Sequence, residues 1–499
     1  MNLEQVYQKI SENKAEMVSS LSKLVSIPSV AVETPGDMPF GKAVHEAFTT
    51  MLDMGKAEGF AVFNANNYGG HIDFPGSGEG MVGVVGHLDV VPEGDGWDFE
   101  PYGGEIREMD DFCKDSEAVP CICGRGTQDD KGPVVASFYA MKALRECGFQ
   151  PEKTIRLILG LDEETKWNGM RYYLSEVDEV PDCGFTPDSD FPLIRAEKGI
   201  LVFDIASKFG QTRGKGLELT SIKGGTAPNA VAGFARAVIM DSAGGGYDLI
   251  KEMVANARSQ KGWKINCKGI GKSFEITVQG KPAHGARPHK GLNAISQLME
   301  FLGGLNFIND EISDFISFYN EHIGYDLHGE RIGCCISDED SGQLIFNVGM
   351  IEMDKNSAKL TINIRYPVSA LADDVYAGIM EVVGPYGMGI VKEKHQLPIN
   401  IPEDSPLITT LMDVYQKHTG DMESKPLVVG GGTYARAFDN FVAFGARFPG
   451  EPGFEHQRNE HVPVDNLEKM ARIYAEAIYR LAGETAPEEA EQNADNAAE

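Results

Sequence analysis

Histidine and acidic side chains gather at five points of the sequence, where an apolar run ends or a helix begins. They are His87 and Asp89, Asp129 and Asp130, Glu163 and Glu164, Asp188 and Asp190, and His456 and His461. Active sites of open α/β sheets gather at the carboxyl ends of strands, so we expect these groups to lie close together. Imidazole and carboxylate without cysteine favour zinc, manganese or cobalt in a catalytic site over a structural zinc site.

The segment "LILGLDEETKWNG" places Asp162, Glu163 and Glu164 in a row at the mouth of an apolar strand. Adjacent like charges repel each other and resist desolvation, so this row has no comfortable structural interpretation. A divalent cation removes that repulsion. Two histidines and three carboxylates serve two metal ions only if one carboxylate and a water bridge them, which leaves positions open for hydrolysis. Asp162 has no predicted role beyond the turn at the strand end.

Each of these residues also has a structural interpretation when it is taken alone. A single histidine after a strand is more often a hydrogen-bonded structural residue. Asp129 and Asp130 precede a helix and could cap it, and Asp188 could form an Asx turn. The set as a whole favours a metal site. Asp89 lies two residues after His87, and in an extended segment it can hold the second imidazole nitrogen of that histidine.

The apolar pattern predicts an α/β domain with an insertion. Short apolar strands at 81–86 and 153–161 alternate with a helical pattern at 131–148, as in a largely parallel sheet. Segments 272–280 and 359–367 alternate apolar and polar residues, which predicts half-exposed antiparallel strands. Strand, glycine turn and helix start return at 425–438, and a helix capped by Asp465 closes the chain at 464–483.

The predicted fold class is therefore α/β, with a mixed, largely parallel sheet in a catalytic domain over 1–197 and 398–483. An inserted α+β lid domain with an antiparallel sheet spans 198–397. Residues 484–499 carry six acids and no bases, which predicts a disordered tail.

Composition narrows the function further. The formal net charge is −30, which disfavours nucleic acid and anionic membranes as partners because both are polyanions. No opening segment reads as a signal peptide, and no apolar run has the length of a membrane span. The eight cysteines lack a disulfide framework, and Cys121 and Cys123 are too close for a zinc hairpin. We expect ordinary thiols and a cytoplasmic location.

The ordered motifs of this chain resemble a known family. They are "GHLDVVPEGDGWDFEPYGGEI", "GRGTQDDKGP", "LDEET", "TPDSDFP", "KPAHGARPHKGLNA", "NIRYP", "GGGTYAR" and "HQRNE", in order from residue 86 to 460. The set resembles the dinuclear-metal exopeptidases and deacylases related to aminoacylase, carnosinase and the glutamate-releasing carboxypeptidases. Within that family it is most similar to the bacterial dipeptidases.

The resemblance implies a role for each ligand candidate. His87 and Asp188 hold one metal ion, Glu164 and His456 hold the other, and Asp129 bridges them. Zinc is the favoured ion, with manganese and cobalt as alternatives. Asp89 orients His87. Glu163 is the general base and acid, which activates a metal-bridging water and then protonates the leaving amine. A cis peptide after Asp129 is also typical of the family.

The resemblance also implies that the inserted domain acts as a lid over a small peptide substrate. His284 of "PAHG" stabilises the oxyanion, and Arg365 of "NIRYP" binds the substrate carboxylate. A cross-strand salt bridge is the alternative role for Arg365. Asn229 is another lid contact, although Ala232 stands where relatives usually have proline. Gly431, Gly432 and Thr433 lie at a predicted helix N-terminus suited to a carboxylate.

Three hypotheses for the function remain open. A metal-dependent dipeptidase is favoured over an N-acyl amino acid deacylase by the long lid and by the "GGGTYAR" and "NIRYP" motifs. A catalytically inactive relative that binds metal or peptide is disfavoured, because all five ligand candidates, Glu163 and Asp89 are present. The long lid also favours a monomer, since relatives with shorter lids often dimerise through theirs.

Overall fold

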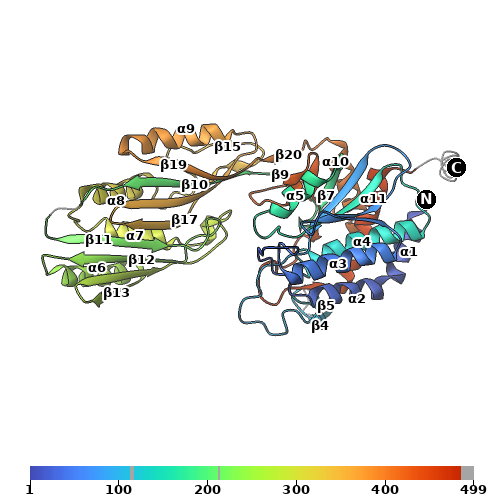
Figure 1. The fold of residues 1–499 in the computed structure, drawn as a ribbon, viewed down its shortest axis with the longest axis horizontal. Helices are drawn as coiled ribbons and strands as arrows, with labels where there is room; N and C mark the ends of the chain where they lie inside the picture. The colour runs from blue at the N-terminus through green and yellow to red at the C-terminus, as the bar shows by residue number, and fades with distance from the viewer. Residues whose placement is uncertain (113–116, 212–213, 485–499) are drawn as a thin grey trace. The chain divides into compact units, whose positions relative to one another are not determined.

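The computed structural model describes residues 1–112, 117–211 and 214–484 (Figure 1). The predicted disordered tail therefore lies, apart from Glu484, outside the described residues. Contacts between Cα atoms divide the chain into two compact units. Unit 1 comprises Met1–Arg195, Asn400–Leu427 and the chain from Gly432 onward, and unit 2 comprises Ala196–Ile399 and Val428–Gly431.

Residues 428–431 correct one detail of the predicted domain boundaries, which assigned them to the catalytic domain. This segment packs with unit 2 instead. The amide of Lys198 donates a hydrogen bond to the carbonyl of Val429 (2.9 Å). A Cβ atom on Gly430 would lie 3.8 Å from the side chain of Arg365, which also belongs to unit 2.

Unit 1 contains most of a nine-stranded sheet. In order across the sheet its strands are β1 (Ala61–Asn64), β2 (Gly70–Phe74), β6 (Thr154–Gly160), β3 (Met81–His87), β7 (Cys183–Thr186), β22 (Phe441–Ala443), β9 (Ile194–Glu197) and β20 (Ile399–Asn400), with β21 (Leu427–Val429) beside β9. The central strands β6, β3, β7 and β22 are parallel to one another, whereas β1 and β2 on one side and β9 on the other pair antiparallel. The mixed sheet with a parallel centre confirms the predicted fold class.

Helices surround this sheet and bury its apolar side chains. They are α1 (Leu3–Glu12), α2 (Lys14–Val25), α3 (Lys42–Ala57), α4 (Lys131–Glu146), α5 (Asn168–Glu176), α10 (Pro406–Thr419), the 3₁₀ turn η3 (Tyr434–Ala437) and α11 (Val464–Ala482). Helix α4 is buried from Lys131 to Leu144, and α11 packs along it. Asp465 does not cap α11 as predicted, because the helix begins at Val464 after Pro463 and Asp465 pairs with Lys14.

Two small sheets complete unit 1. Strands β4 (Glu105–Met109), β5 (Val119–Cys123) and β24 (His461–Pro463) form one antiparallel sheet. Strands β8 (Ser189–Asp190) and β23 (Ala446–Arg447) form a short parallel pair. Cys121 and Cys123 lie in β5 and are buried.

Unit 2 contains an eight-stranded sheet in which neighbouring strands are antiparallel, as predicted for the insertion. Its order is β13 (Lys264–Ile270), β14 (Ser273–Gln279), β12 (Phe234–Asp241), β11 (Leu217–Gly224), β17 (Ile345–Asp354), β18 (Ser357–Tyr366), β10 (Gly199–Lys208) and β19 (Gly389–Gln396). A two-stranded ladder pairs β15 (Ser337–Asp338) with β16 (Gly342–Gln343). Helices and short turns accompany the strands: α6 (Gly246–Lys261), η1 (Pro288–Lys290), α7 (Ala294–Leu302), α8 (Asp310–His322), α9 (Ala372–Val383) and η2 (Gly384–Tyr386).

Strand β18 differs from the half-exposed strand that its alternation predicts. Leu360, Ile362 and Ile364 enter the apolar core of unit 2. The polar residues between them are buried as well, including Asn363 and Arg365. Buried polar groups need hydrogen-bond partners, and here Nε of Arg365 donates to the side-chain oxygen of Asn363.

Among the described residues, no helix combines the length and the apolar character that crossing a membrane requires.

Candidate metal centre

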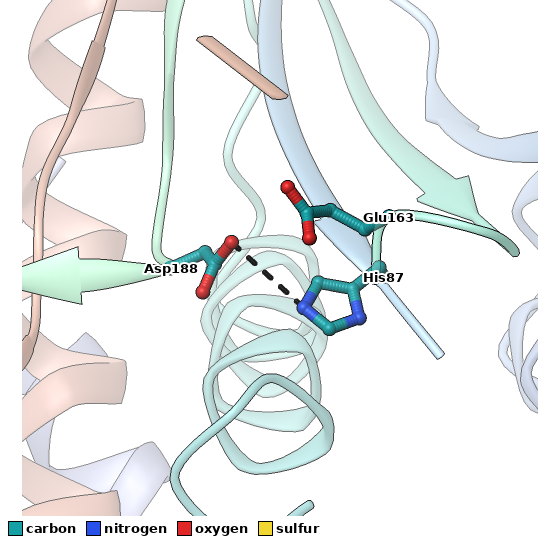
Figure 2. Close-up of side chains that lie close together, drawn as sticks. All are labelled: His87, Glu163 and Asp188. Atoms are coloured by element: carbon teal, nitrogen blue, oxygen red, sulfur yellow. Dashed lines mark ion pairs between the residues drawn. The ribbon is translucent and has the colours of Figure 1, made fainter. Parts of the chain in front are cut away.

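Three neighbouring parallel strands bring the predicted ligands to one edge of the unit 1 sheet. His87 is the last residue of β3, the turn with Glu163 and Glu164 follows β6, and Asp188 follows β7. Because β6, β3 and β7 are adjacent and parallel, their carboxyl ends meet at this edge. Figure 2 shows His87, Glu163 and Asp188 turned toward one another.

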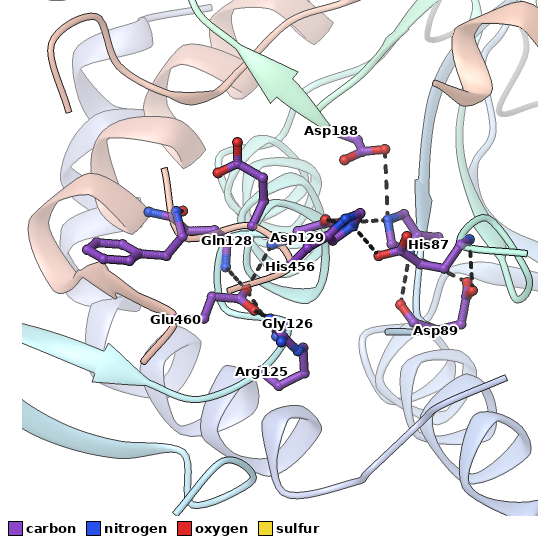
Figure 3. A network of polar contacts seen from close by, with 12 residues as sticks. His87, Asp89, Arg125, Gly126, Gln128, Asp129, Asp188, His456 and Glu460 are labelled. Carbon is purple, nitrogen blue, oxygen red and sulfur yellow. Dashed lines mark hydrogen bonds and ion pairs between the residues drawn. The ribbon is translucent and has the colours of Figure 1, made fainter. Parts of the chain in front are cut away.

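The carboxylate of Asp129 lies between two histidines. Its Oδ1 atom lies 2.9 Å from Nε2 of His87, and its Oδ2 atom lies 3.0 Å from Nε2 of His456 (Figure 3). A carboxylate that faces a different imidazole with each oxygen has the geometry of a bridging ligand.

Two further acids complete the cluster, one beside each histidine. Oδ2 of Asp188 lies 3.8 Å from Nε2 of His87, and Oε1 of Glu164 lies 2.9 Å from Nε2 of His456. Ligand atoms of His87, Glu163 and Asp188 all lie within 4.8 Å of one another, and so do those of His87, Asp129 and Glu164. Nitrogen and oxygen donors at this spacing fit divalent zinc, manganese or cobalt.

Burial and mutual repulsion shift the pKa values of these acids. Burial raises the pKa of Glu163 well above its usual value, and the nearby charges of Glu164 and Asp89 raise it further. Burial also raises the pKa of Asp188 well above its usual value, and the charge of Asp129 adds to the shift. The pKa of Glu164 is raised by the same two causes. These acids therefore retain protons at higher pH until a cation compensates their charge.

For the two histidines and Asp129, the shifts in pKa favour the charged form instead. Burial favours the neutral imidazole of His456, but its hydrogen bonds to Asp129 and Glu164 outweigh this and raise its pKa to about 11. At His87 the hydrogen bonds to Asp129 and Asp89 likewise outweigh burial, so its pKa lies well above the usual value. Asp129 accepts from both imidazoles, and its pKa is lowered despite its burial. A divalent cation at the same place would substitute for these protons.

Asp89 holds both His87 and the acidic turn, but it does so with different atoms. Nδ1 of His87 lies 2.9 Å from the carbonyl oxygen of Asp89 and 3.4 Å from its carboxylate. A carbonyl oxygen only accepts, so Nδ1 carries the proton and Nε2 is the nitrogen available to a metal. The Asp89 carboxylate accepts the backbone amides of Glu163 and Glu164, both at 3.1 Å.

Asp162 has a structural role that the sequence did not reveal. Its carboxylate accepts the backbone amides of Asn168 (2.6 Å) and Gly169 (3.0 Å) at the start of α5. Burial raises its pKa to about 7, and the charge of Asp89 adds to that shift. Asp162 thus closes the turn that carries the two glutamates.

Sequence reasoning also missed Glu460 and Arg125, although both lie in quoted motifs. Glu460 is fully buried and accepts a hydrogen bond from Nη1 of Arg125 at 2.6 Å. Its other oxygen accepts the backbone amides of Gly126, Gln128 and Asp129 (Figure 3). This acid therefore fixes the loop that presents Asp129, where the peptide between Asp129 and Asp130 is cis, as the resemblance implied.

Three of the initial candidates lie outside the cluster. Asp130 accepts the backbone amide of His87 (3.0 Å) instead of joining the ligand set. Asp190 pairs with Arg447. His461 lies in β24 and contacts the carbonyl of Asn459 and the carboxylate of Asp111.

The predicted lid residues lie in unit 2. Asn229 and His284 are neighbours, because Ala230 pairs with His284 and the Gly285 amide donates to the Asn229 carbonyl. Arg365 is buried in β18, and its Nε donates to Asn363 at 3.2 Å.

The predicted glycine turn is divided between the two units. Gly431 belongs to unit 2, and Gly432 and Thr433 belong to unit 1. Thr433 caps only the four-residue 3₁₀ turn η3, which corrects the predicted helix start.

The carboxyl edge of the parallel strands thus brings together histidine and carboxylate groups of a kind that can hold a divalent cation. Residues 83–480 match the sequence model of the peptidase family M20/M25/M40. The chain belongs to this family, whose members are metal-dependent peptidases.

Relatives and solved structures agree with that assignment. The chain is 34% identical over 483 residues to a putative dipeptidase of Staphylococcus epidermidis, covering 95% of this chain and 98% of the relative. It is 34% identical over 481 residues to putative dipeptidase YtjP of Bacillus subtilis, covering 95% and 99%. Its fold is similar to human carnosine dipeptidase 1 (TM-score 0.55, 16% identity, covering 97% and 99%). It is also similar to the dipeptidase Dug1p of Saccharomyces cerevisiae (TM-score 0.56, 14% identity, covering 96% and 98%).

Removing metal should destabilise unit 1 in a pH-dependent way. A bound cation stabilises the folded state by about 3 kcal/mol at a hundredfold excess over its dissociation constant. The pKa values of Asp188 and Glu164 are raised in the cation-free protein, so falling pH protonates these ligands and weakens binding. Thermal melts with and without chelator should therefore differ more at about pH 8 than at about pH 5.5. Equal melting temperatures at the higher pH would contradict the metal centre.

Proposed function

We propose that this protein hydrolyses the peptide bond of dipeptides, with metal ions held by His87, Asp129, Glu164, Asp188 and His456. The observation that carries the proposal is the Asp129 carboxylate, whose two oxygens face two different histidines. The names of its relatives in Staphylococcus epidermidis and Bacillus subtilis support dipeptides as the substrate class.

The ligand set divides into two halves that share Asp129. His87 and Asp188 would hold one ion, and Glu164 and His456 the other. Two zinc ions are favoured, because imidazole and carboxylate donors suit zinc. Manganese and cobalt are the alternatives. Such ions, when bound, polarise a substrate carbonyl and lower the pKa of a water to near neutrality.

Glu163 is the group that we assign to proton transfer. It is held at the mouth of β6 by the Asp89 carboxylate, which accepts its backbone amide. Burial and its acidic neighbours raise its pKa, which makes it a stronger base than an exposed glutamate. It would accept a proton from the attacking water and return that proton to the leaving amine.

Six residues outside the ligand set would supply the contacts to the substrate. His284 would donate to the oxyanion, and Arg365 would bind the substrate carboxylate with its planar fork. Asn229, Gly431, Gly432 and Thr433 would complete the binding site. The planar fork of the Arg365 guanidinium suits a carboxylate, and a cross-strand salt bridge is the alternative role for this buried residue.

The two neighbouring glutamates give a sharp test of the mechanism. Glu163→Ala should keep bound metal and lose turnover by roughly 10²- to 10⁴-fold, because only the proton-transfer group is removed. Glu164→Ala should lose metal itself, because a ligand is removed. Metal content by elemental analysis, measured beside dipeptidase activity, distinguishes the two variants. Each variant is the control for the other, and a fully active Glu163→Ala enzyme would refute the mechanism.

A substrate panel separates the dipeptidase from the alternative N-acyl amino acid deacylase. Dipeptides, tripeptides and N-acyl amino acids should be assayed with zinc and then with manganese. We expect dipeptides to be cleaved fastest with either ion. Cleavage of the acyl substrates alone would favour the deacylase, and metal binding without any turnover would favour an inactive relative.

We also propose that the protein is a cytoplasmic monomer. The insertion of about 200 residues is long enough to serve as a complete lid within one chain. The eight cysteines of the sequence lack the spacing pattern of a disulfide framework, which supports a reducing compartment. Light scattering should give the mass of a single chain, and a stable dimer would refute the monomer.

A further inference from the structure

Arg447 lies between the two loops that end at Asp188 and His456. It is the last residue of β23, which pairs in parallel with β8, so that Arg447 lies opposite Asp190. Asp188 immediately precedes β8. The chain then continues from Arg447 through residues 448–455 to His456. These two loops supply ligands to different halves of the proposed metal centre.

The guanidinium of Arg447 contacts both loops at once. Its Nε and Nη2 atoms donate to the two carboxylate oxygens of Asp190, at 2.7 and 2.9 Å. Its Nη1 atom donates to the carboxylate of Glu455, at 3.1 and 3.3 Å. Asp190 lies two residues after Asp188, and Glu455 directly precedes His456. The Arg447 guanidinium thus joins the two ligand loops, with a two-point contact to Asp190 and a further contact to Glu455. This arrangement needs the fork geometry of arginine.

Gly453 makes room for this arrangement. A Cβ atom at this position would lie 1.7 Å from Nη1 of Arg447, so only glycine admits the guanidinium here. The pKa of Arg447 is raised, because its hydrogen bond to Asp190 outweighs the effect of burial. The Arg447 side chain is therefore held in one position by its contacts with Asp190, Glu455 and Gly453.

The loop with His456 depends on such contacts. The backbone of His456 has a φ of 61°, a left-handed conformation that non-glycine residues adopt at a cost of about 1 kcal/mol. Its side chain is 53% exposed, so packing alone does not fix it. The neighbouring Phe454 amide donates to Gln128 (2.8 Å), which ties the same loop to Asp129. Arg447 supplies the matching tie to the loop of Asp188.

We propose that Arg447 is a positioning residue that sets the spacing between Asp188 and His456, and through it the affinity of both halves of the centre for divalent ions. This inference rests on the proposed metal centre. Residues that orient the metal ligands without contacting the ion themselves typically contribute about 10- to 100-fold in metal affinity. Neither Arg447, Asp190 nor Glu455 is itself a member of the proposed ligand set.

The test is metal binding by Arg447→Lys, titrated with Zn²⁺ and with Mn²⁺ by calorimetry or chelator competition. Lysine keeps the positive charge and removes the fork, so one of the two contacts must be lost. We expect the affinity for Zn²⁺ and the affinity for Mn²⁺ each to fall by about tenfold or more. The circular dichroism spectrum should stay unchanged.

Arg156→Lys is the matched control. Arg156 forms the same paired contact with Asp73, at 2.9 and 2.8 Å, and lies at the start of β6, away from the ligand loops. Its replacement should lower the melting temperature and change metal affinity by less than about twofold. An equal loss of affinity in both variants would reduce Arg447 to a general contribution to stability and overturn the proposal.

Two further variants keep the proposal testable if Arg447→Lys does not fold. Glu455→Gln releases only the loop of His456, and Asp190→Asn releases only the loop of Asp188. Each should weaken one of the two binding steps and leave the other near the wild-type value. Wild-type affinity for both ions in all three variants would overturn the proposal. A wild-type protein that binds neither ion would overturn the proposed function itself.

Discussion

Repulsion among buried acids is the constraint on which this structure depends. Asp129, Glu163, Glu164 and Asp188 gather at one edge of the unit 1 sheet, where the pKa of each is raised by burial except that of Asp129, in which hydrogen bonds to two histidines outweigh burial. Of these acids, only Asp129 loses its proton easily, because an imidazole lies against each of its carboxylate oxygens. A protein keeps such a cluster when a cation compensates it, so the same repulsion that disfavours folding gives the site its affinity for metal.

The fold overcomes this repulsion by fixing the backbone around each ligand. The carboxylate of Asp89 holds the turn with the two glutamates, and Glu460 holds the loop of Asp129 through three amides. Both holders are themselves buried acids whose charge is taken up by backbone N–H groups, with Arg125 assisting Glu460. The candidate metal ligands are thus held in place by two further buried carboxylates, those of Asp89 and Glu460, which do not belong to the ligand set.

The sequence predicted the parts of this arrangement that follow from pattern. Strands ending at His87 and before Glu163 are visible as apolar runs, and adjacent parallel strands must share an edge. The sequence pattern does not show which atom of a residue makes a given contact. Asp89 uses its carbonyl toward His87 and its carboxylate toward the glutamate turn, and β18 buries Arg365 on a face that alternation predicted to be exposed. Such choices depend on contacts between segments far apart in the chain, as does the role of Glu460.

The bridging position of Asp129 is the central claim, and a crystal structure of the protein grown with Mn²⁺ tests it most directly. Anomalous scattering locates the ions independently of any assumption about their ligands. We predict two anomalous peaks, each about 2.0–2.2 Å from a different oxygen of Asp129, as expected for a metal–carboxylate bond. A single peak, or two peaks of which only one contacts Asp129, would contradict the account.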